Sequence, residues 1–390
     1  TDRWSDLAWA FATLHVNDAR LLRTVAEESR LALSAFKLEI LSSLAWAFAT
    51  LEQVDSFLFH YIAGELTIRL NEFDTHNSSE TYVTTFAKRI LMSVWAFNFA
   101  GLLGDALLMT AHATLIAIGQ QLDQIKTKTD APVATAIPRK AWLAYPVARQ
   151  QPHVLLDLDD RLVIHKPPDW QVDDSGTSFS LNASRALNEA RPLSWYIRAL
   201  ESPHHHPIYH DVQHQRGFLH RLDVPSSGII IVAKTYQAYY DLQLQLCTGA
   251  VVRDYITVCH GWMPPARSEI SARVHEGSAG SSVRRHGKPS CTLLKVVAHI
   301  QHRGSSLSLV AIRLGTGRTH QIRVHSAHIA HPTVCDGRYS ALATFTSDSA
   351  WCPRNFLHRH CLVFRDAAGS VVEAAAPLPH DLLDGLSHVS

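Results

Sequence analysis

The sequence predicts an all-α helical-repeat region followed by an α+β domain built on a mixed, largely antiparallel sheet. The chain of 390 residues exceeds what one hydrophobic core usually organises, which favours two domains. All 17 prolines follow residue 131, whereas only four of the 18 glycines precede it. Stretches poor in both residues favour helices, because neither suits a helix interior. The change of composition near residue 130 therefore separates a helical part from a mixed one.

A repeated motif marks the first part. The letters LAWAFATL occur at residues 7–14 and again at residues 44–51, and a looser copy, VWAFNFAGL, occupies residues 94–102. In the first two copies Leu, Phe and Leu fall at positions i, i+4 and i+7, which is one stripe of a helix. Repeats at this spacing are typical of helical hairpins stacked into a solenoid. The longer second interval predicts an insertion at residues 71–81.

Each copy of the motif carries one tryptophan: Trp9, Trp46 and Trp95. We expect these side chains to fill the hydrophobic seam between helices. The repeats also loosely resemble the degenerate helical repeats of some organellar RNA-binding proteins. That resemblance implies a mitochondrion or plastid as the compartment, and it leaves RNA and protein open as partners of the helical region.

The composition also sets the predicted domain boundaries. Residues 1–125 form the helical-repeat domain. Residues 126–140, KTKTDAPVATAIPRK, have the composition of a linker. Residues 141–388 form the α+β domain.

Short β-branched or alternating runs predict the strands of the second domain. They lie at residues 161–167, 228–235, 254–262, 292–300 and 306–314. The clearest helix covers residues 320–330, with Thr319 as its expected N-cap. Mixed strands with a few helices indicate an α+β domain.

Charge and cysteine content narrow the function classes only a little. The formal net charge is +1, but residues 281–325 contain eight Lys and Arg and no Asp or Glu. Such a stretch is usually a solvated face, and it also suits a phosphate backbone. Six cysteines without a CxxC pair indicate reduced thiols in an intracellular protein. No apolar run is long enough to span a bilayer, so we expect no membrane partner.

The segment HRLDVPSSG, residues 220–228, carries the strongest chemical signal. A turn containing Asp223 runs directly into an apolar strand, which would hold the carboxylate rigidly, as a catalytic acid requires. The structural alternative is an Asp that accepts hydrogen bonds from turn amides. The turn by itself favours this alternative.

Five segments together resemble the RluA-type pseudouridine synthases, over residues 150 to 380. They are HRLDVPSSG (220–228), DLDDRLVIHKPPDW (157–170), VVRDYITVCHG (251–261), LGTGRTHQIRVH (314–325) and HPTVCDGRY (331–339). Two departures stand out: Ser226 replaces the usual Thr, and His165 stands where the family often has Asn. The resemblance implies isomerisation of uridine to pseudouridine in structured RNA, most often rRNA or tRNA.

The resemblance also implies the catalytic residues. Asp223 would act as nucleophile or general base, Arg323 would pair with it, and Tyr255 would stack on the target base. The alternatives are a surface Arg for Arg323 and a core strand Tyr for Tyr255.

The substrate-binding residues implied by the resemblance are Arg221, Arg318 and His320. Arg221 would fill the space left by a flipped base or brace the turn, and we hold these two interpretations equal. Arg318 would brace its loop or contact phosphate.

The expected partners exclude a metal and a cofactor. His328, His331 and Cys335 have loosely ligand-like spacing, but they lack a compact fourth ligand. The family resemblance implies no organic cofactor, and the sequence does not indicate an oligomeric state. The main rival function is a noncatalytic RNA-binding protein that retains the synthase fold.

Overall fold

The computed structural model describes residues 3–75, 78–128, 151–173, 191–200, 205–277 and 280–387. The chain forms two compact units. The first contains residues 1–129, 236–250 and 285–288, and the second contains the rest. Most of the predicted linker lies outside the described residues, so the predicted domain boundaries stay a prediction. Within the described parts of the chain, no helix is both long enough and apolar enough to cross a membrane.

The first unit is built from helices, as the repeats predict. Their bounds are α1 (Arg3–Leu14), α2 (Ala19–Arg30), α3 (Leu38–Thr50), α4 (Ser56–Asn71), α5 (Glu80–Phe99), α6 (Asp105–Lys128) and α9 (Tyr236–Cys247), with a 3₁₀ turn η1 (Leu33–Ala35). The side chains of Asp18, Asp55 and Ser79 accept hydrogen bonds from the first free amides of α2, α4 and α5, which fixes where these helices begin. The predicted insertion at residues 71–81 falls between α4 and α5, although residues 76 and 77 lie outside the described part.

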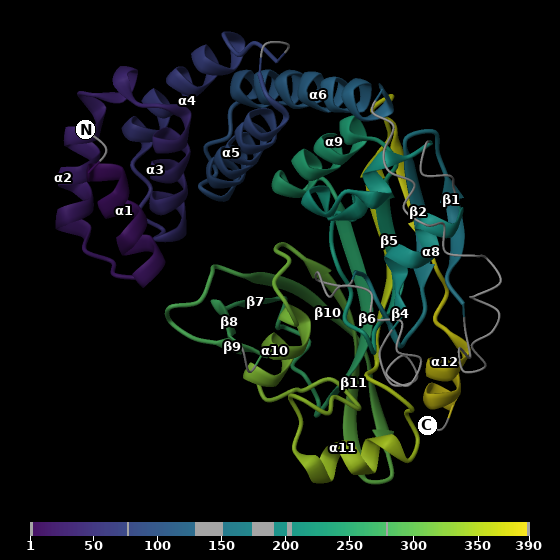
Figure 1. Cartoon of the computed structure of the whole chain (residues 1–390). Coiled ribbons are helices and arrows are strands. Elements are labelled where there is room, and N and C mark those ends of the chain that lie inside the picture. The colour runs from purple at the N-terminus through teal and green to yellow at the C-terminus, as the bar shows by residue number, and fades with distance from the viewer. Residues whose placement is uncertain are drawn as a thin grey trace. The chain divides into compact units, whose positions relative to one another are not determined.

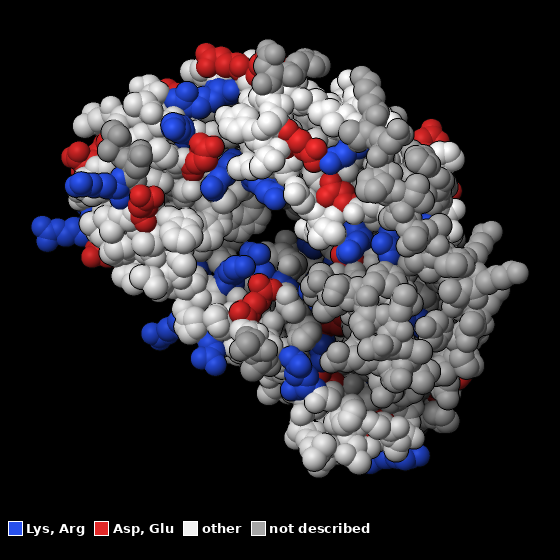
Figure 2. Space-filling model, viewed as in Figure 1, with Lys and Arg blue, Asp and Glu red and all other residues white. Residues whose placement is uncertain are grey.

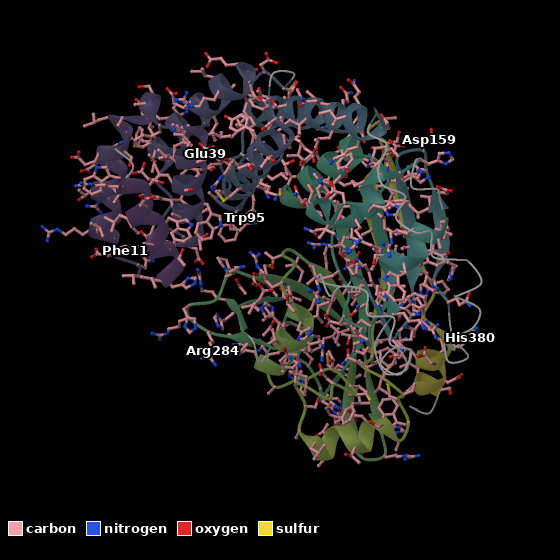
Figure 3. The ribbon with its side chains drawn as sticks, in the orientation of Figure 1. Phe11, Glu39, Trp95, Asp159, Arg284 and His380 are labelled. Atoms are coloured by element: carbon pink, nitrogen blue, oxygen red, sulfur yellow. The ribbon has the colours of Figure 1, made fainter. Side chains whose placement is uncertain are left out.

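The three repeat motifs lie on α1, α3 and α5, which stack side by side (Figure 1). The prediction that the repeat tryptophans fill the seam is wrong for Trp9, which is 50% exposed. Trp46 and Trp95 are only half-buried. The seam is filled by residues such as Leu44 and Phe48, which lie two positions from Trp46 and therefore on another face of the helix. Figure 3 labels Trp95 on α5, where its ring stacks on Phe99 at 5.2 Å between centroids.

Helix α9 belongs to the first unit although it follows a strand of the sheet in the sequence. The Asp123 carboxylate of α6 caps it, accepting hydrogen bonds from the amides of Tyr236 at 2.8 Å and Gln237 at 3.0 Å. At its other end, the Asn98 side chain of α5 donates to the carbonyl of Cys247 at 3.2 Å. Both ends of α9 are thus held by side chains from distant parts of the sequence.

A nine-stranded mixed sheet forms the centre of the second unit. In spatial order it contains β1 (His153–Asp157), β2 (Arg161–Lys166), β5 (Ser227–Ala233), β12 (Leu357–Arg365), β6 (Val252–His260), β11 (Ser305–Leu314), β10 (Cys291–His302) and β7 (Glu269–Ser271), while β13 (Val371–Ala375) pairs with β12. Only β5 and β12 pair in parallel within this sheet as described. The mixed, largely antiparallel sheet is therefore confirmed.

Smaller elements complete the second unit (Figure 1). Two short pairs are β3 (Trp170–Gln171) with β4 (Arg191–Pro192), and β8 (Val274–Gly277) with β9 (Gly280–Val283). The helices are α8 (Leu193–Leu200), α10 (Gln321–His328), α11 (Leu342–Ser349) and α12 (His380–Ser387), with 3₁₀ turns η2 (Pro207–His210) and η3 (Val212–Gly217). Helix α10 starts after His320, whose φ of 55° is left-handed and whose side chain makes no cap. The expectation of Thr319 as its N-cap is wrong.

Two helical glycines of the first unit form a matched pair for testing how tightly α9 is packed. A Cβ atom added at Gly119 of α6 would lie 2.4 Å from the Cα atom of Gln237, whereas one added at Gly64 of α4 would meet nothing within 4 Å. We expect Gly119→Ala to lower the free energy of unfolding by about 1–3 kcal/mol through overpacking. Gly64→Ala should raise it by about 0.5–1 kcal/mol, because alanine favours the helix. Urea unfolding followed by circular dichroism measures both, and equal effects would contradict the α6–α9 packing.

Candidate active site

The turn before β5 places the Asp223 carboxylate near the start of this central strand of the sheet. All seven residues of β5 are buried, so the strand anchors the turn firmly. The backbone amide of Ser226 donates to the carbonyl of Asp223 at 3.0 Å, which closes the turn. The Asp223 side chain is 14% exposed. It is therefore partly shielded from water yet open to a substrate.

A buried lysine holds the residue next to Asp223. Lys166, at the end of β2, donates to the carbonyls of Pro167 at 2.9 Å, Trp170 at 2.6 Å and Val224 at 3.2 Å. Burial, aided by the charge of Arg354, lowers the pKa of Lys166 to about 7. Lys166 of the Lys-Pro segment thus holds the turn that carries Asp223 by bonding to its backbone.

The parallel pairing of β5 and β12 brings Arg359 to the turn that carries Asp223. Gly228 pairs with Arg359, and a Cβ atom at Gly228 would lie 2.3 Å from the Arg359 carbonyl oxygen. Only glycine, here at φ 131°, allows this approach. The Arg359 guanidinium donates to His220 Nδ1 at 2.8 Å and to the carbonyl of Arg221 at 3.5 Å.

The same Arg359 holds the Tyr255 side chain, which β6 contributes. Its Nε atom donates to the Tyr255 hydroxyl at 2.9 Å, and its guanidinium lies 4.9 Å from the centroid of the tyrosine ring. Tyr255 is 3% exposed. Arg359 therefore links Tyr255 to the turn that carries Asp223.

Arg323 lies in the first turn of α10, and its side chain pairs with two carboxylates from outside that helix. Its Nη1 atom donates to Asp223 at 3.0 Å. Its planar fork binds the other carboxylate, Asp336, through Nε at 2.8 Å and Nη2 at 2.7 Å. The expected Arg323–Asp223 pair is present, but the two-bond geometry belongs to Asp336. Asp336, whose side chain is fully buried, also accepts from the amides of Arg338 and Tyr339.

Burial and charge set the protonation of this pair. Burial alone would lower the pKa of Arg323, but hydrogen bonds and charge attraction from Asp336 and Asp223 raise it above its ordinary value. Burial likewise opposes ionisation of Asp336, but Arg323 and the backbone amides lower its pKa. Both groups therefore stay charged at neutral pH.

His320 faces the other oxygen of Asp223. Its Nε2 atom lies 3.7 Å from Asp223 Oδ1, and its Nδ1 atom lies 2.9 Å from the hydroxyl of Tyr339. Burial lowers the pKa of His320, although the charge of Asp223 opposes that shift. The structure thus brings three of the predicted site residues, Asp223, His320 and Arg323, into direct proximity.

The predicted site residues Arg221 and Arg318 have other surroundings. Arg221 is exposed, and its side chain makes no hydrogen bond to a described residue, so it is free to reach a substrate. Arg318 donates to the carbonyl of Pro289 at 3.4 Å and braces its loop. Burial lowers the pKa of Arg318.

Among the described residues, no three His, Cys, Asp or Glu side chains gather as a metal site would require. His331 instead bonds the carbonyl of His260 at 2.7 Å through Nδ1. The thiol sulfur of Cys335 lies 3.6 Å from the hydroxyl oxygen of Ser349.

Sequence reasoning missed Asp336, Tyr339 and Arg359 as members of the site. The first two stand in the segment HPTVCDGRY, which was matched to the family without a role for either residue. Arg359 lies in β12, a mostly buried strand, and an arginine that is 1% exposed is rare unless it is paired. That unusual burial was the signal, and only the structure shows it.

Comparisons with known proteins identify the family. The profile of the RNA pseudouridylate synthase family matches residues 160–328. Ribosomal large subunit pseudouridine synthase C of Haemophilus ducreyi is 30% identical over 268 residues, covering 67% of this chain and 74% of the relative. Ribosomal large subunit pseudouridine synthase D of Salmonella typhimurium is 32% identical over 247 residues, covering 59% of this chain and 68% of that relative. Among solved structures, Human RNA Pseudouridylate Synthase Domain Containing 1 is 24% identical, with a TM-score of 0.46 over 60% of this chain and 86% of that one.

The chain belongs to the RluA-type pseudouridine synthases. It is an RNA pseudouridine synthase, an enzyme rather than a noncatalytic RNA-binding protein of the same fold.

The fork of Arg323 can be tested against an equivalent fork at the surface. Arg323→Lys keeps the charge but cannot bind Asp336 through two bonds and reach Asp223 at once. We expect its single-turnover rate to fall by about two orders of magnitude with RNA affinity nearly unchanged. Arg313 holds Asp254 through two bonds of 2.7 Å, but its side chain is 55% exposed. Arg313→Lys should therefore lower the single-turnover rate very little. Equal losses of rate in Arg313→Lys and Arg323→Lys would contradict the importance of the pairing of Arg323 with Asp336 and Asp223.

Proposed function

We propose that this enzyme isomerises uridine in structured RNA, with ribosomal RNA as the substrate class, and that Asp223 supplies the reacting carboxylate. The observation that supports the proposal most is the half-sheltered Asp223, held by Arg323 and faced by His320. The relatives' names supply the substrate class, because both are ribosomal large subunit enzymes. Transfer RNA is the second candidate.

The chemistry explains why a fixed carboxylate is needed. The bond between N1 of uracil and C1′ of ribose breaks, the ring rotates, and C5 bonds to C1′ while its proton leaves and N1 gains one. An ionised Asp223 can attack C1′ as a nucleophile or remove a proton from C2′ as a base. Both routes need the negative charge of the Asp223 carboxylate held in one position, and the contact with Arg323 holds it there.

Tyr255 and Arg221 have complementary roles in this proposal. The Tyr255 ring, held by Arg359, is the stacking partner of the target base in this proposal, and because it is only 3% exposed the site must open before a base reaches it. The exposed Arg221 fills the space from which that base is extruded, an event that costs about a few kcal/mol. Tyr255 therefore acts on the flipped base and Arg221 on the RNA it leaves.

The charges on the two parts of the chain favour the sheet unit as the main phosphate contact. Residues 1–129 carry fourteen acidic and ten basic side chains. On these helices the two signs lie interspersed (Figure 2). Residues 289–325 carry five basic and no acidic side chains. Arg313 and Arg323 are paired with carboxylates, so the exposed Lys295 and Arg303 are the side chains of this segment best placed for a phosphate contact.

Asp223→Asn tests the role of the carboxylate. The amide matches the carboxylate in size but can act neither as nucleophile nor as base, so pseudouridine formation should fall by about three orders of magnitude or more. RNA affinity and its salt dependence should stay near those of the unmodified enzyme, because no positive charge is lost. Mass spectrometry of ribosomal and transfer RNA after incubation with each protein gives the readout.

The exposed Asp384→Asn is the matched control, and it should retain full activity. Substantial product from Asp223→Asn would refute the catalytic assignment. Product in transfer RNA alone would overturn the proposed substrate class and leave the catalytic assignment intact.

A further inference from the structure

We propose that Tyr339 is a positioning residue that holds His320 as the neutral tautomer with its Nε2–H directed at Asp223. The inference rests on the proposed catalytic role of Asp223. It assigns a function to a tyrosine that follows the catalytic segments in the sequence and does not itself reach the reacting carboxylate. Two of its features carry the argument, the ring and the hydroxyl.

The Tyr339 ring supports Arg323. The guanidinium carbon of Arg323 lies 5.1 Å from the ring centroid. The amide of Tyr339 also donates to Asp336 at 3.1 Å, and Asp336 holds the Arg323 fork. Tyr339 is thus fixed by the same ion pair that contacts Asp223.

The Tyr339 hydroxyl lies between two polar partners. The backbone amide of Ser281, in β9, donates to it at 3.2 Å. Nδ1 of His320 lies 2.9 Å away on the other side, and the two rings meet edge to face at 5.7 Å. Since an amide can only donate, the hydroxyl oxygen accepts from Ser281 and its proton is available for His320.

This arrangement selects one histidine tautomer. If the hydroxyl donates to Nδ1, the ring proton sits on Nε2, which faces Asp223 Oδ1 at 3.7 Å. The opposite tautomer would direct a lone pair at a carboxylate, which is unfavourable. Burial raises the pKa of Tyr339, so its hydroxyl keeps the proton that this bond requires.

The charged groups around His320 determine why a neutral ring matters. They are Asp223 and Asp336, which favour protonation, and Arg323 and Arg338, which oppose it. A doubly protonated ring would place a second full positive charge against the Asp223 carboxylate. That charge would make the carboxylate a weaker nucleophile and base. A hydrogen bond accepted by Nδ1 stabilises the neutral form and prevents this.

Tyr339→Phe removes the hydroxyl and keeps the ring beneath Arg323. We expect its single-turnover rate at neutral pH to fall by about ten-fold, with the affinity for RNA within about two-fold of normal. The acid limb of its pH–rate profile should move to higher pH, because His320 protonates more easily. A purely structural role would lower the amount of folded protein without moving the profile. Tyr82→Phe, a 49% exposed tyrosine on α5, is the matched control.

A second variant tests whether Tyr339 acts through His320. His320→Asn keeps a residue type that tolerates the left-handed backbone of this position. In that background, Tyr339→Phe should change the rate by less than about two-fold, because the partner is absent. Rate losses that multiply in the double variant would overturn the proposal, as would an unchanged rate or an unchanged acid limb in Tyr339→Phe.

Asp223→Asn, measured alongside, separates the two levels of inference. If Asp223→Asn is inactive and Tyr339→Phe is normal, the role of Tyr339 falls and the proposed function stands. If Asp223→Asn keeps its activity, the proposed function falls and the role of Tyr339 falls with it.

Discussion

The buried ion pair between Arg323 and Asp336 is the constraint on which the rest of the site depends. A carboxylate that is fully buried must be paired, and Asp336 takes both bonds of the arginine fork as well as two backbone amides. Since the fork is planar, its third nitrogen can point in only one direction. That direction is toward Asp223. The guanidinium is thus oriented by one carboxylate in order to hold another.

The sequence predicted the residues of the candidate site better than the contacts that arrange them. The motifs predicted that Arg323 pairs with Asp223, and the structure places the two side chains in contact. The partners of those residues come from elsewhere: Asp336 from a turn after α10, and Arg359 from β12, more than 130 residues after the turn that carries Asp223. Such contacts depend on strand pairing across the sheet, which no local pattern specifies.

The helical part shows the same limit. The repeats predicted helices correctly, because their apolar spacing matches one helical stripe. They misplaced Trp9, because the buried face of α1 is lined by Ser5, Ala8 and Ala12, while Trp9 and Leu14 of the motif are 50% and 70% exposed. They also gave no sign that α9, which directly follows β5, would pack on α6. The cap from Asp123 to α9 joins residues 113 apart in the sequence.

The proposed function requires that Asp336 fix Arg323 so that Arg323 can hold Asp223. The most direct measurement is the single-turnover rate of Asp336→Asn at saturating enzyme, beside its affinity for the same RNA. An asparagine keeps the shape but turns one acceptor into a donor facing the fork, so we expect the rate to fall by about two orders of magnitude with affinity unchanged. A folded Asp336→Asn enzyme with a normal single-turnover rate would contradict the account.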